Sequence, residues 1–363
     1  MVDEKVTRRG WLKTAVGTVV GFAVGMVGGY LAGTARAPPP TPAPEIAIVT
    51  FQTGWAFVGR DAPFFLAMEK GYYEEEGLSL RIFRGYGTSD VLKNMEAKKF
   101  DFGMPGTSGT IKAIAEGAQL KIVAMLHLRS VNGVIVRKDS GIKGPQDMVG
   151  KIYGQTFASE TSLLLPYFLE INGVDPATVE MRNLDPGVAV SALLAGETDI
   201  CGFYSESPSA ALWEKVNHIN FADWGLDVYN NAIVAHLDLM AENPELIRRF
   251  LKATFMGIRD AMANPEEAVD AMHKYRPELK REDIRIQLAF GLQGYLGNPE
   301  ETAKLGLGWV TEEKMAFTQK IASEAFGFEE VPLERIYTNE YLTKILPPEN
   351  AEENINAIIA EVM

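Results

Sequence analysis

Residues 63–80 read PFFLAMEKGYYEEEGLSL, and this stretch is the most informative part of the sequence. The apolar run that opens it predicts a helix, which Gly71 would end. The three acidic residues at 74–76 and the glycine at position 77 predict a turn and a reversal of the chain. The alternating residues from Leu78 onward predict entry into a strand.

The alternation of strands and helices continues on both sides of this stretch. We expect strands at 46–51, 78–84, 101–104, 121–128 and 131–137, and helices at 63–76, 89–98 and 110–116. A second block repeats the pattern, with strands at 151–157, 179–183 and 199–204 and helices at 162–172, 187–195 and 207–215. Such alternation is typical of an α/β fold with a mainly parallel sheet.

From residue 244 onward the pattern is almost wholly helical. We expect helices at 244–263, 265–274, 281–293 and 311–326. Several of these segments begin with Asn-Pro-Glu or Arg-Pro-Glu, and both proline and an acidic residue suit the first turn of a helix. The predicted architecture is therefore two α/β lobes with a helical C-terminal extension.

The composition excludes several classes of protein. The 363 residues are 47% hydrophobic and 23% charged, which is typical of globular domains and excludes collagen, coiled coils and disordered tails. The net charge of −13 argues against a nucleic-acid partner. The single cysteine, Cys201, excludes an intrachain disulfide, and the four histidines show no zinc-binding spacing. We therefore expect no metal and no cofactor.

The first 37 residues have the anatomy of an export signal. The sequence TRRGWLK at 7–13 precedes an uncharged run at 14–34 and a small-residue exit at 35–37. The arginine pair resembles the twin-arginine (Tat) signal, with Trp11 where phenylalanine is usual. A permanent membrane anchor is the alternative, since about 20 uncharged residues can span a bilayer. Residues 38–44 predict an extended proline-rich linker. We expect the protein in the periplasm or on the outer face of the cytoplasmic membrane.

Together with later motifs, residues 63–80 resemble the NMT1/THI5-like family of ABC-transporter substrate-binding proteins. The later motifs are GYGTS at 85–89, KFDFG at 99–103, KIYG at 151–154, AGETD at 195–199 and NPEEAV at 264–269. The resemblance implies a periplasmic-binding-protein (type II) fold, in which two α/β lobes close on a ligand. It also implies that lobe 1 comprises residues 45–137 plus 234–363 and that lobe 2 comprises 138–233.

The carboxyl ends of the predicted strands mark where a ligand would lie, because open α/β sheets bind ligands there. In the first such loop, Trp55 and Phe57 are suited to stack on a planar ligand, although either ring could instead pack into the core. Arg60 and Asp61 stand where pyrimidine-binding relatives of the family have an Asn-His pair. This departure weakens the case for a pyrimidine.

Four further loops present hydroxyl, aromatic and acidic side chains at the same edge. Ordinary helix capping is the alternative for the hydroxyl groups and for Glu206, which could otherwise accept a hydrogen bond from a ring N–H group. The predicted ligand-binding residues are Trp55, Phe57, Arg60, Asp61, Tyr86, Thr107, Ser108, Ser159, Glu160, Thr161, Tyr204 and Glu206.

The aromatic residues and Glu206 favour a small heterocyclic nutrient of the thiamine-pyrimidine or riboflavin type. Arg60 leaves a sulfonate, taurine or nitrate as the alternative. The family implies a solute-binding protein that delivers its ligand to a membrane ABC permease subunit, and we expect a monomer. A sensor with the same fold and site is a further alternative.

Enzymatic activity is not expected. Eukaryotic relatives in the family make the thiamine pyrimidine, and the resemblance implies that they use a cysteine-rich motif, iron and an active-site histidine. Here Cys201 stands alone and Asp61 replaces the histidine. An export signal also separates the protein from cytosolic substrates, and no Gly-x-Ser-x-Gly motif is present.

Overall fold

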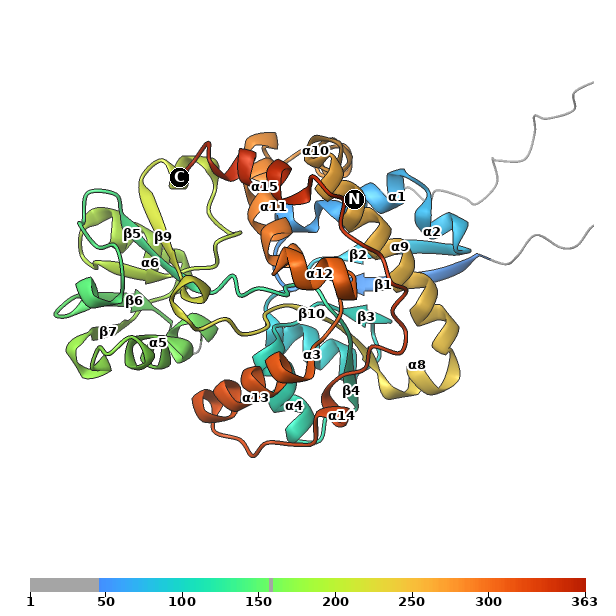
Figure 1. Ribbon diagram of the computed structural model, residues 1–363, viewed down its shortest axis with the longest axis horizontal. Helices are drawn as coiled ribbons and strands as arrows, with labels where there is room; N and C mark the ends of the chain where they lie inside the picture. Colours follow the sequence, from blue (N-terminus) through green and yellow to red (C-terminus); the bar gives the residue numbers. More distant parts are fainter. Residues whose placement is uncertain (1–45, 157–158) are drawn as a thin grey trace, which may run out of the picture. The chain divides into compact units, whose positions relative to one another are not determined.

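Five strands form the first of two sheets, in the order β2-β1-β3-β10-β4 (Figure 1). The structure is a computed structural model that describes residues 46–156 and 159–363; the predicted signal at 1–37 and linker at 38–44 lie outside the described residues. The strands are β1 (Ala47–Gln52), β2 (Leu78–Phe83), β3 (Phe102–Gly103), β4 (Leu120–Met125) and β10 (Ala232–His236). Only β10 runs antiparallel to its neighbours in this described sheet, so the sheet is mainly parallel, as predicted.

The second sheet repeats this arrangement, with the order β7-β6-β8-β5-β9. Its strands are β5 (Gly133–Arg137), β6 (Ile152–Gln155), β7 (Glu180–Asn183), β8 (Ile200–Gly202) and β9 (Val216–Asn220). Here β5 is the antiparallel strand. In the chain, β5 of the second sheet follows β4 of the first, and β10 of the first sheet follows β9 of the second. The chain therefore passes between the sheets twice, at 126–132 and at 221–231, which we call the crossing segments.

The pairing of β5 bears on the division into lobes. The predicted boundary after residue 137 would assign β5 to lobe 1, whereas β5 is hydrogen-bonded to β8 and β9 in the second sheet. Similarly, a boundary at residue 234 would divide β10, which begins at Ala232. We propose that the lobes meet at the two crossing segments.

Helices flank both sheets and continue to the C-terminus. The first sheet is accompanied by α1 (Ala62–Glu69), α2 (Tyr72–Glu75), α3 (Thr88–Glu96) and α4 (Thr107–Ala115), and the second by α5 (Glu160–Ile171), α6 (Pro186–Ala195) and α7 (Ala210–Trp213). The C-terminal helices are α8 (Leu237–Glu242), α9 (Pro244–Ala263), α10 (Pro265–Tyr275), α11 (Arg281–Leu296), α12 (Pro299–Leu305), α13 (Glu312–Phe326), α14 (Leu333–Ile336) and α15 (Ala351–Ile359). Short 3-10 turns occupy Gly59–Asp61, Pro145–Met148, Pro176–Thr178 and Phe221–Trp224. No helix in the described ranges is both long enough and apolar enough to cross a membrane.

The helix expected at 63–76 is two helices, because Gly71 adopts a left-handed conformation between them. Its φ angle is 75°, a value that costs glycine little but is strained for other residues. The chain therefore turns at Gly71, and Tyr72, Tyr73, Glu74 and Glu75 form the short helix α2. The sequence predicted the break at Gly71 but not the helical turn that follows it.

The Asn-Pro-Glu segments begin helices as predicted, whereas Arg-Pro-Glu at 276–278 lies in a turn before α11, which begins at Arg281. Proline occupies the first turn of α9, α10 and α12. The side chains of Asn243 and Asn298 accept hydrogen bonds from backbone N–H groups in α9 and α12, respectively. The α12 start carries the same Asn-Pro-Glu signal, although no helix is among those predicted there.

Aromatic stacking holds the first sheet against α1 and α9. The rings of Phe102 and Phe250 lie 4.0 Å apart between centroids, and those of Phe51 and Phe64 lie 4.6 Å apart. All four side chains are fully buried. Burial of each such side chain contributes about 1.5–3 kcal/mol to stability. This packed layer gives the loops at the strand ends a rigid base.

Candidate functional site

A cavity of about 880 Å³ lies where the loops at the strand ends of both sheets converge. Residues after β1 and β2 line one part of its wall, and residues of α3 and α4 extend it. Residues after β6 and β8 line another part, so both sheets contribute. The cavity therefore lies at the carboxyl ends of strands, the position that the topology predicted.

Six of the twelve predicted residues line this cavity, and six do not. Those in the wall are Trp55, Arg60, Tyr86, Ser159, Glu160 and Tyr204. Those outside the lining are Phe57, Asp61, Thr107, Ser108, Thr161 and Glu206. The first group remains the predicted ligand-contacting set, whereas the second group requires a different account of its contacts.

Three residues of the second group make contacts with other side chains of the protein outside the cavity lining. Phe57 packs against Phe65 and lies beneath the Arg276 guanidinium, 3.9 Å from its ring centroid. The Thr107 hydroxyl faces the sulfur of Met125 at 3.6 Å. Thr161 is buried and lies near the hydroxyl of Tyr153, at 3.5 Å.

Arg60 enters the cavity wall as part of a buried charged cluster. Its guanidinium forms an ion pair with Glu206, and its Nε atom lies 3.6 Å from Asp61 Oδ1. The other Glu206 oxygen lies 2.8 Å from Nε2 of His127. All four side chains are almost fully buried. We call Arg60, Asp61, His127 and Glu206 the buried charge cluster.

The two carboxylates of this cluster respond differently to burial. Burial by itself would raise the pKa of Glu206, but Arg60 and His127 outweigh it and hold the pKa at about 2. For Asp61 burial dominates over the attraction of Arg60 and raises the pKa to about 6. Both carboxylates are mostly ionised at neutral pH, and Glu206 is the one that is hydrogen-bonded to the Arg60 guanidinium.

The helix α11 fixes the position of Arg60. The backbone N–H of Gly59 donates to Gln287 Oε1 at 2.9 Å, and the hydroxyl of Tyr295 donates to the carbonyl of Arg60 at 3.1 Å. A Cβ atom at Gly291 would lie 2.6 Å from Cβ of Arg60, so glycine allows the helix to approach this closely. The guanidinium is thus held in place by packing as well as by charge.

Glu160 provides a second polar centre in the wall. Its carboxylate accepts hydrogen bonds from the hydroxyl of Ser108 at 2.6 Å, the hydroxyl of Tyr204 at 2.8 Å and the amide of Asn230 at 3.2 Å. Burial raises the pKa of Glu160, although these hydrogen bonds act in the opposite direction. Ser108 lies in α4 beside the first sheet and Glu160 in α5 beside the second, so this hydrogen bond joins the two halves of the site.

Aromatic side chains stand at the exposed part of the lining. Trp55 is 52% exposed and Tyr86 is 63% exposed, which is unusual for rings of this size. The guanidinium of Arg84 lies 4.4 Å from the ring centroid of Tyr86. Exposed rings at a cavity can stack on a planar ligand.

Several residues of the site were not predicted from the sequence. His127 lies two residues after the end of β4, and the strand-end rule could have found it had the predicted strand not been extended to residue 128. Asn231 and Phe326 also line the cavity. They come from a crossing segment and from the end of α13, and no local pattern marks them.

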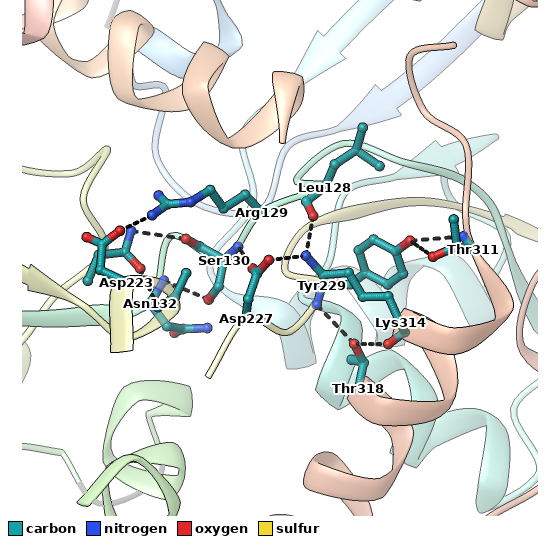
Figure 2. Close-up of polar contacts among 12 residues, drawn as sticks. Leu128, Arg129, Ser130, Asn132, Asp223, Asp227, Tyr229, Thr311, Lys314 and Thr318 are labelled. Carbon is teal, nitrogen blue, oxygen red and sulfur yellow. Dashed lines mark hydrogen bonds and ion pairs between the residues drawn. The ribbon is translucent and has the colours of Figure 1, made fainter. Parts of the chain in front are cut away.

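Polar contacts from α13 hold both crossing segments, as Figure 2 shows. Lys314 donates to the carbonyl of Leu128 at 2.6 Å and pairs with Asp227, which also accepts from the backbone N–H of Ser130 at 2.8 Å. In the second segment the backbone N–H of Tyr229 donates to Thr318 Oγ1 at 3.0 Å. The two crossing segments therefore share one support.

Within residues 46–156 and 159–363, no three histidine, cysteine, aspartate or glutamate side chains are grouped so that they could hold a metal ion.

Comparison with known proteins identifies relatives over most of the chain. The family model described as NMT1/THI5 like matches residues 60–268. The riboflavin-binding protein RibY of Chloroflexus aurantiacus is 26% identical over 322 residues, which cover 86% of this chain and 90% of that protein. The 4-amino-5-hydroxymethyl-2-methylpyrimidine phosphate synthase of Schizosaccharomyces pombe is 24% identical, covering 66% of this chain and 72% of the enzyme.

A solved structure with the same fold is the periplasmic aliphatic sulphonate binding protein SsuA from Escherichia coli. It superimposes with a TM-score of 0.65 at 19% identity, covering 85% of this chain and 96% of SsuA. This likeness confirms the predicted periplasmic-binding-protein fold.

Proposed function

Because this chain belongs to the NMT1/THI5-like family, we propose that it is the solute-binding protein of an ABC importer and captures a neutral heteroaromatic compound of the riboflavin type. The observation that carries the proposal is the cavity, which combines a large volume, exposed aromatic rings and cationic groups that are already paired. The similarity to RibY over most of both chains supports the same ligand class.

The size of the cavity supports a ligand larger than a single small ring. Cavities of about 300–1,000 Å³ hold drug-sized ligands, and this one measures about 880 Å³. Nitrate, taurine or one pyrimidine ring would leave most of this space unfilled. A tricyclic ring system with a polar chain fills it better and can stack on Trp55 or Tyr86.

The charges of the wall support a neutral ligand. Arg60 and Lys112 are the two cationic side chains in the described lining. Arg60 pairs with Glu206 and Lys112 pairs with Glu116. A sulfonate would therefore meet no free cation among these lining residues, and a sulfonate-binding role is the weaker candidate.

We propose that the protein binds its ligand without turnover. Relatives include named synthases as well as binding proteins. The one cysteine of the chain, Cys201, is buried in β8, and burial raises the pKa of its thiol to about 12. A thiol in this environment is a poor nucleophile and a poor metal ligand.

Export by the Tat route, a place outside the cytoplasm and delivery to a membrane permease complete the proposal. The twin arginines Arg8 and Arg9 carry the export part of it. Changing both to lysine should leave the protein in the cytoplasm, as measured by cell fractionation. Unchanged export would contradict the Tat route, while the binding role would stand. We further propose that the protein acts as a monomer, which sedimentation analysis tests.

Calorimetric titration of the full chain tests the ligand class. The titrants are riboflavin, a thiamine pyrimidine, taurine, ethanesulfonate and nitrate. We expect one-to-one binding of riboflavin, accompanied by a rise in melting temperature, because the ligand stabilises the folded state. Binding of a sulfonate or nitrate alone would overturn the heterocycle part of the proposal. Release of a chemically altered product would overturn the non-enzymatic part.

A further inference from the structure

The described cavity lining contains two acidic residues, Glu116 and Glu160. Of these two, Glu160 forms no ion pair with a lysine, arginine or histidine. The other lining carboxylate, that of Glu116, pairs with Lys112. Glu160 instead accepts hydrogen bonds from two neutral hydroxyl groups and one amide, donated by Ser108, Tyr204 and Asn230. No ion pair therefore neutralises this carboxylate, and a ligand in the cavity lies beside it.

The hydrogen-bonding capacity of this carboxylate is not exhausted. An ionised carboxylate offers about four acceptor positions, and the three donors named above occupy three of them. Glu160 remains part of the cavity wall. The remaining position can accept a hydrogen bond from an N–H or O–H group of a ligand. The carboxylate would repel an anionic group at the same place.

The donors to the Glu160 carboxylate come from elements of both sheets and from a crossing segment. Ser108 belongs to α4 beside the first sheet, Tyr204 follows β8 of the second sheet, and Asn230 lies in a crossing segment. The carboxylate is thus fixed where elements of both sheets meet. A ligand bound between these elements would therefore lie close to the Glu160 carboxylate.

We infer that Glu160 is the specificity-determining residue that excludes anionic ligands from the cavity and selects neutral ligands carrying a hydrogen-bond donor. The inference rests on the proposed function, because it assigns a role within the same ligand site. Selection by an unfavourable charge is a general way of separating ligands that share a shape. Glu160 can also accept one hydrogen bond from a neutral ligand that carries a donor.

Riboflavin and riboflavin 5′-phosphate provide a matched test, because they share the ring system and differ in one anionic group. The full chain is titrated with each, and the ratio of their dissociation constants is the readout. We expect the phosphate to bind at least about tenfold more weakly to the unaltered chain, and Glu160→Gln to reduce this ratio by about tenfold. Glutamine keeps the size of the side chain and one acceptor oxygen.

Two control variants separate charge from structure. Ser108→Ala removes one hydroxyl donor from the carboxylate but leaves the charge of Glu160, so both flavins should bind more weakly and the ratio should stay the same or rise. Glu116→Gln removes one negative charge elsewhere in the lining, and it should lower the ratio less than Glu160→Gln does. If either control lowers the ratio as much as Glu160→Gln, the inference is overturned.

A further variant keeps the test decisive if Glu160→Gln does not fold. Tyr204→Phe removes one donor from the carboxylate and leaves its charge less compensated, so the ratio should rise; a fall would overturn the inference. Equal binding of both flavins by the unaltered chain would overturn the role of Glu160 but not riboflavin binding. Failure of the unaltered chain to bind either flavin would instead overturn the riboflavin part of the proposed function, and the inference with it.

Discussion

Arg60 and Glu206 lie 146 positions apart in the chain and form a fully enclosed ion pair. Each was predicted as a ligand-binding group, because each lies in a loop at the end of a strand. In the folded chain one oxygen of the Glu206 carboxylate pairs with the Arg60 guanidinium, and His127 contacts the other oxygen. The pair therefore shapes the wall of the cavity, and Glu206 itself does not line it.

Replacing Glu206 with glutamine should destabilise the protein by about 3 kcal/mol, because it removes the hydrogen-bonded counter-charge of the buried Arg60 guanidinium and leaves only Asp61, at 3.6 Å. Urea denaturation measures this loss. Asp223→Asn is the matched control, since Asp223 pairs with Arg129 at the exposed surface. It should cost less than about 1 kcal/mol. Equal losses in the two variants would mean that the buried pair contributes no more than an exposed one.

His218 should make the protein less stable in mild acid. Burial lowers the pKa of its imidazole to about 4, whereas a histidine in the unfolded chain has its ordinary pKa of about 6.5. Between these values the unfolded state binds more protons, so the free energy of unfolding falls as the pH falls from 6.5 to 4. The slope has an upper limit of about 1.4 kcal/mol per pH unit.

The raised pKa of Asp61 acts in the opposite direction in part of this range, so the comparison must isolate His218. As the pH falls from about 6 to 4, the native state binds a proton at Asp61 before the unfolded state does. His218→Gln removes only the histidine contribution. Urea denaturation at pH 7, 5.5 and 4.5 should show a smaller acid loss in this variant, and parallel curves would refute the assignment.

Among the elements, α11 and α13 connect parts of the fold that are distant in sequence. α11 holds the 3-10 turn Gly59–Asp61, and with it Arg60, through Gln287 and Tyr295. α13 holds both crossing segments through Lys314 and Thr318 (Figure 2). The C-terminal helices therefore support the site, although Phe326 is the one described lining residue that they supply.

Lys314→Met should loosen the crossing segments, because it removes a charged donor to the carbonyl of Leu128 and the partner of Asp227. We expect a loss of about 1–2 kcal/mol in the free energy of unfolding. Hydrogen–deuterium exchange should also become faster at the Ser130 amide, which donates to Asp227.

Lys320→Met is the control for this change, since Lys320 is exposed on the same helix. It should alter neither the unfolding free energy nor the exchange of the crossing segments. Unchanged exchange at Ser130 in the Lys314 variant would show that α13 does not support these segments.

For the molecule as a whole, two sheets contribute loops to one cavity, and the chain crosses between them twice. Trp55 stands at the exposed part of that cavity, so we expect Trp55→Ala to weaken riboflavin binding by about tenfold through loss of ring stacking. Because Trp55 is half exposed, the free energy of unfolding of the protein should change little in this variant. Calorimetric titration together with urea denaturation measures both effects.

Trp224→Ala is the matched control, since Trp224 is a partly exposed tryptophan that does not line the cavity. Its removal should leave riboflavin affinity unchanged. If Trp55→Ala binds riboflavin as tightly as the unaltered chain, Trp55 does not contact the ligand.

Most of the fold follows from patterns along the chain. Helix α9 has the predicted bounds, and the strands of both sheets were expected within a few residues, except β9 and β10. Proline-led helix starts, glycine reversals and apolar alternation are local features, and local sterics and hydrogen bonding decide them. The motifs that carried the family resemblance are local in the same sense.

The site could be predicted only in part, for a physical reason. The strand-end rule found the loops that surround the cavity, because the topology of parallel strands places those loops at one edge. Whether a charged side chain in such a loop faces the cavity or is neutralised by another residue depends on neighbours far away in sequence. Arg60 and Glu206, or Glu160 and Ser108, meet only once both sheets are folded. Local sequence thus sets the elements and the edge where a ligand lies, while long-range packing and burial set the charge that the ligand encounters.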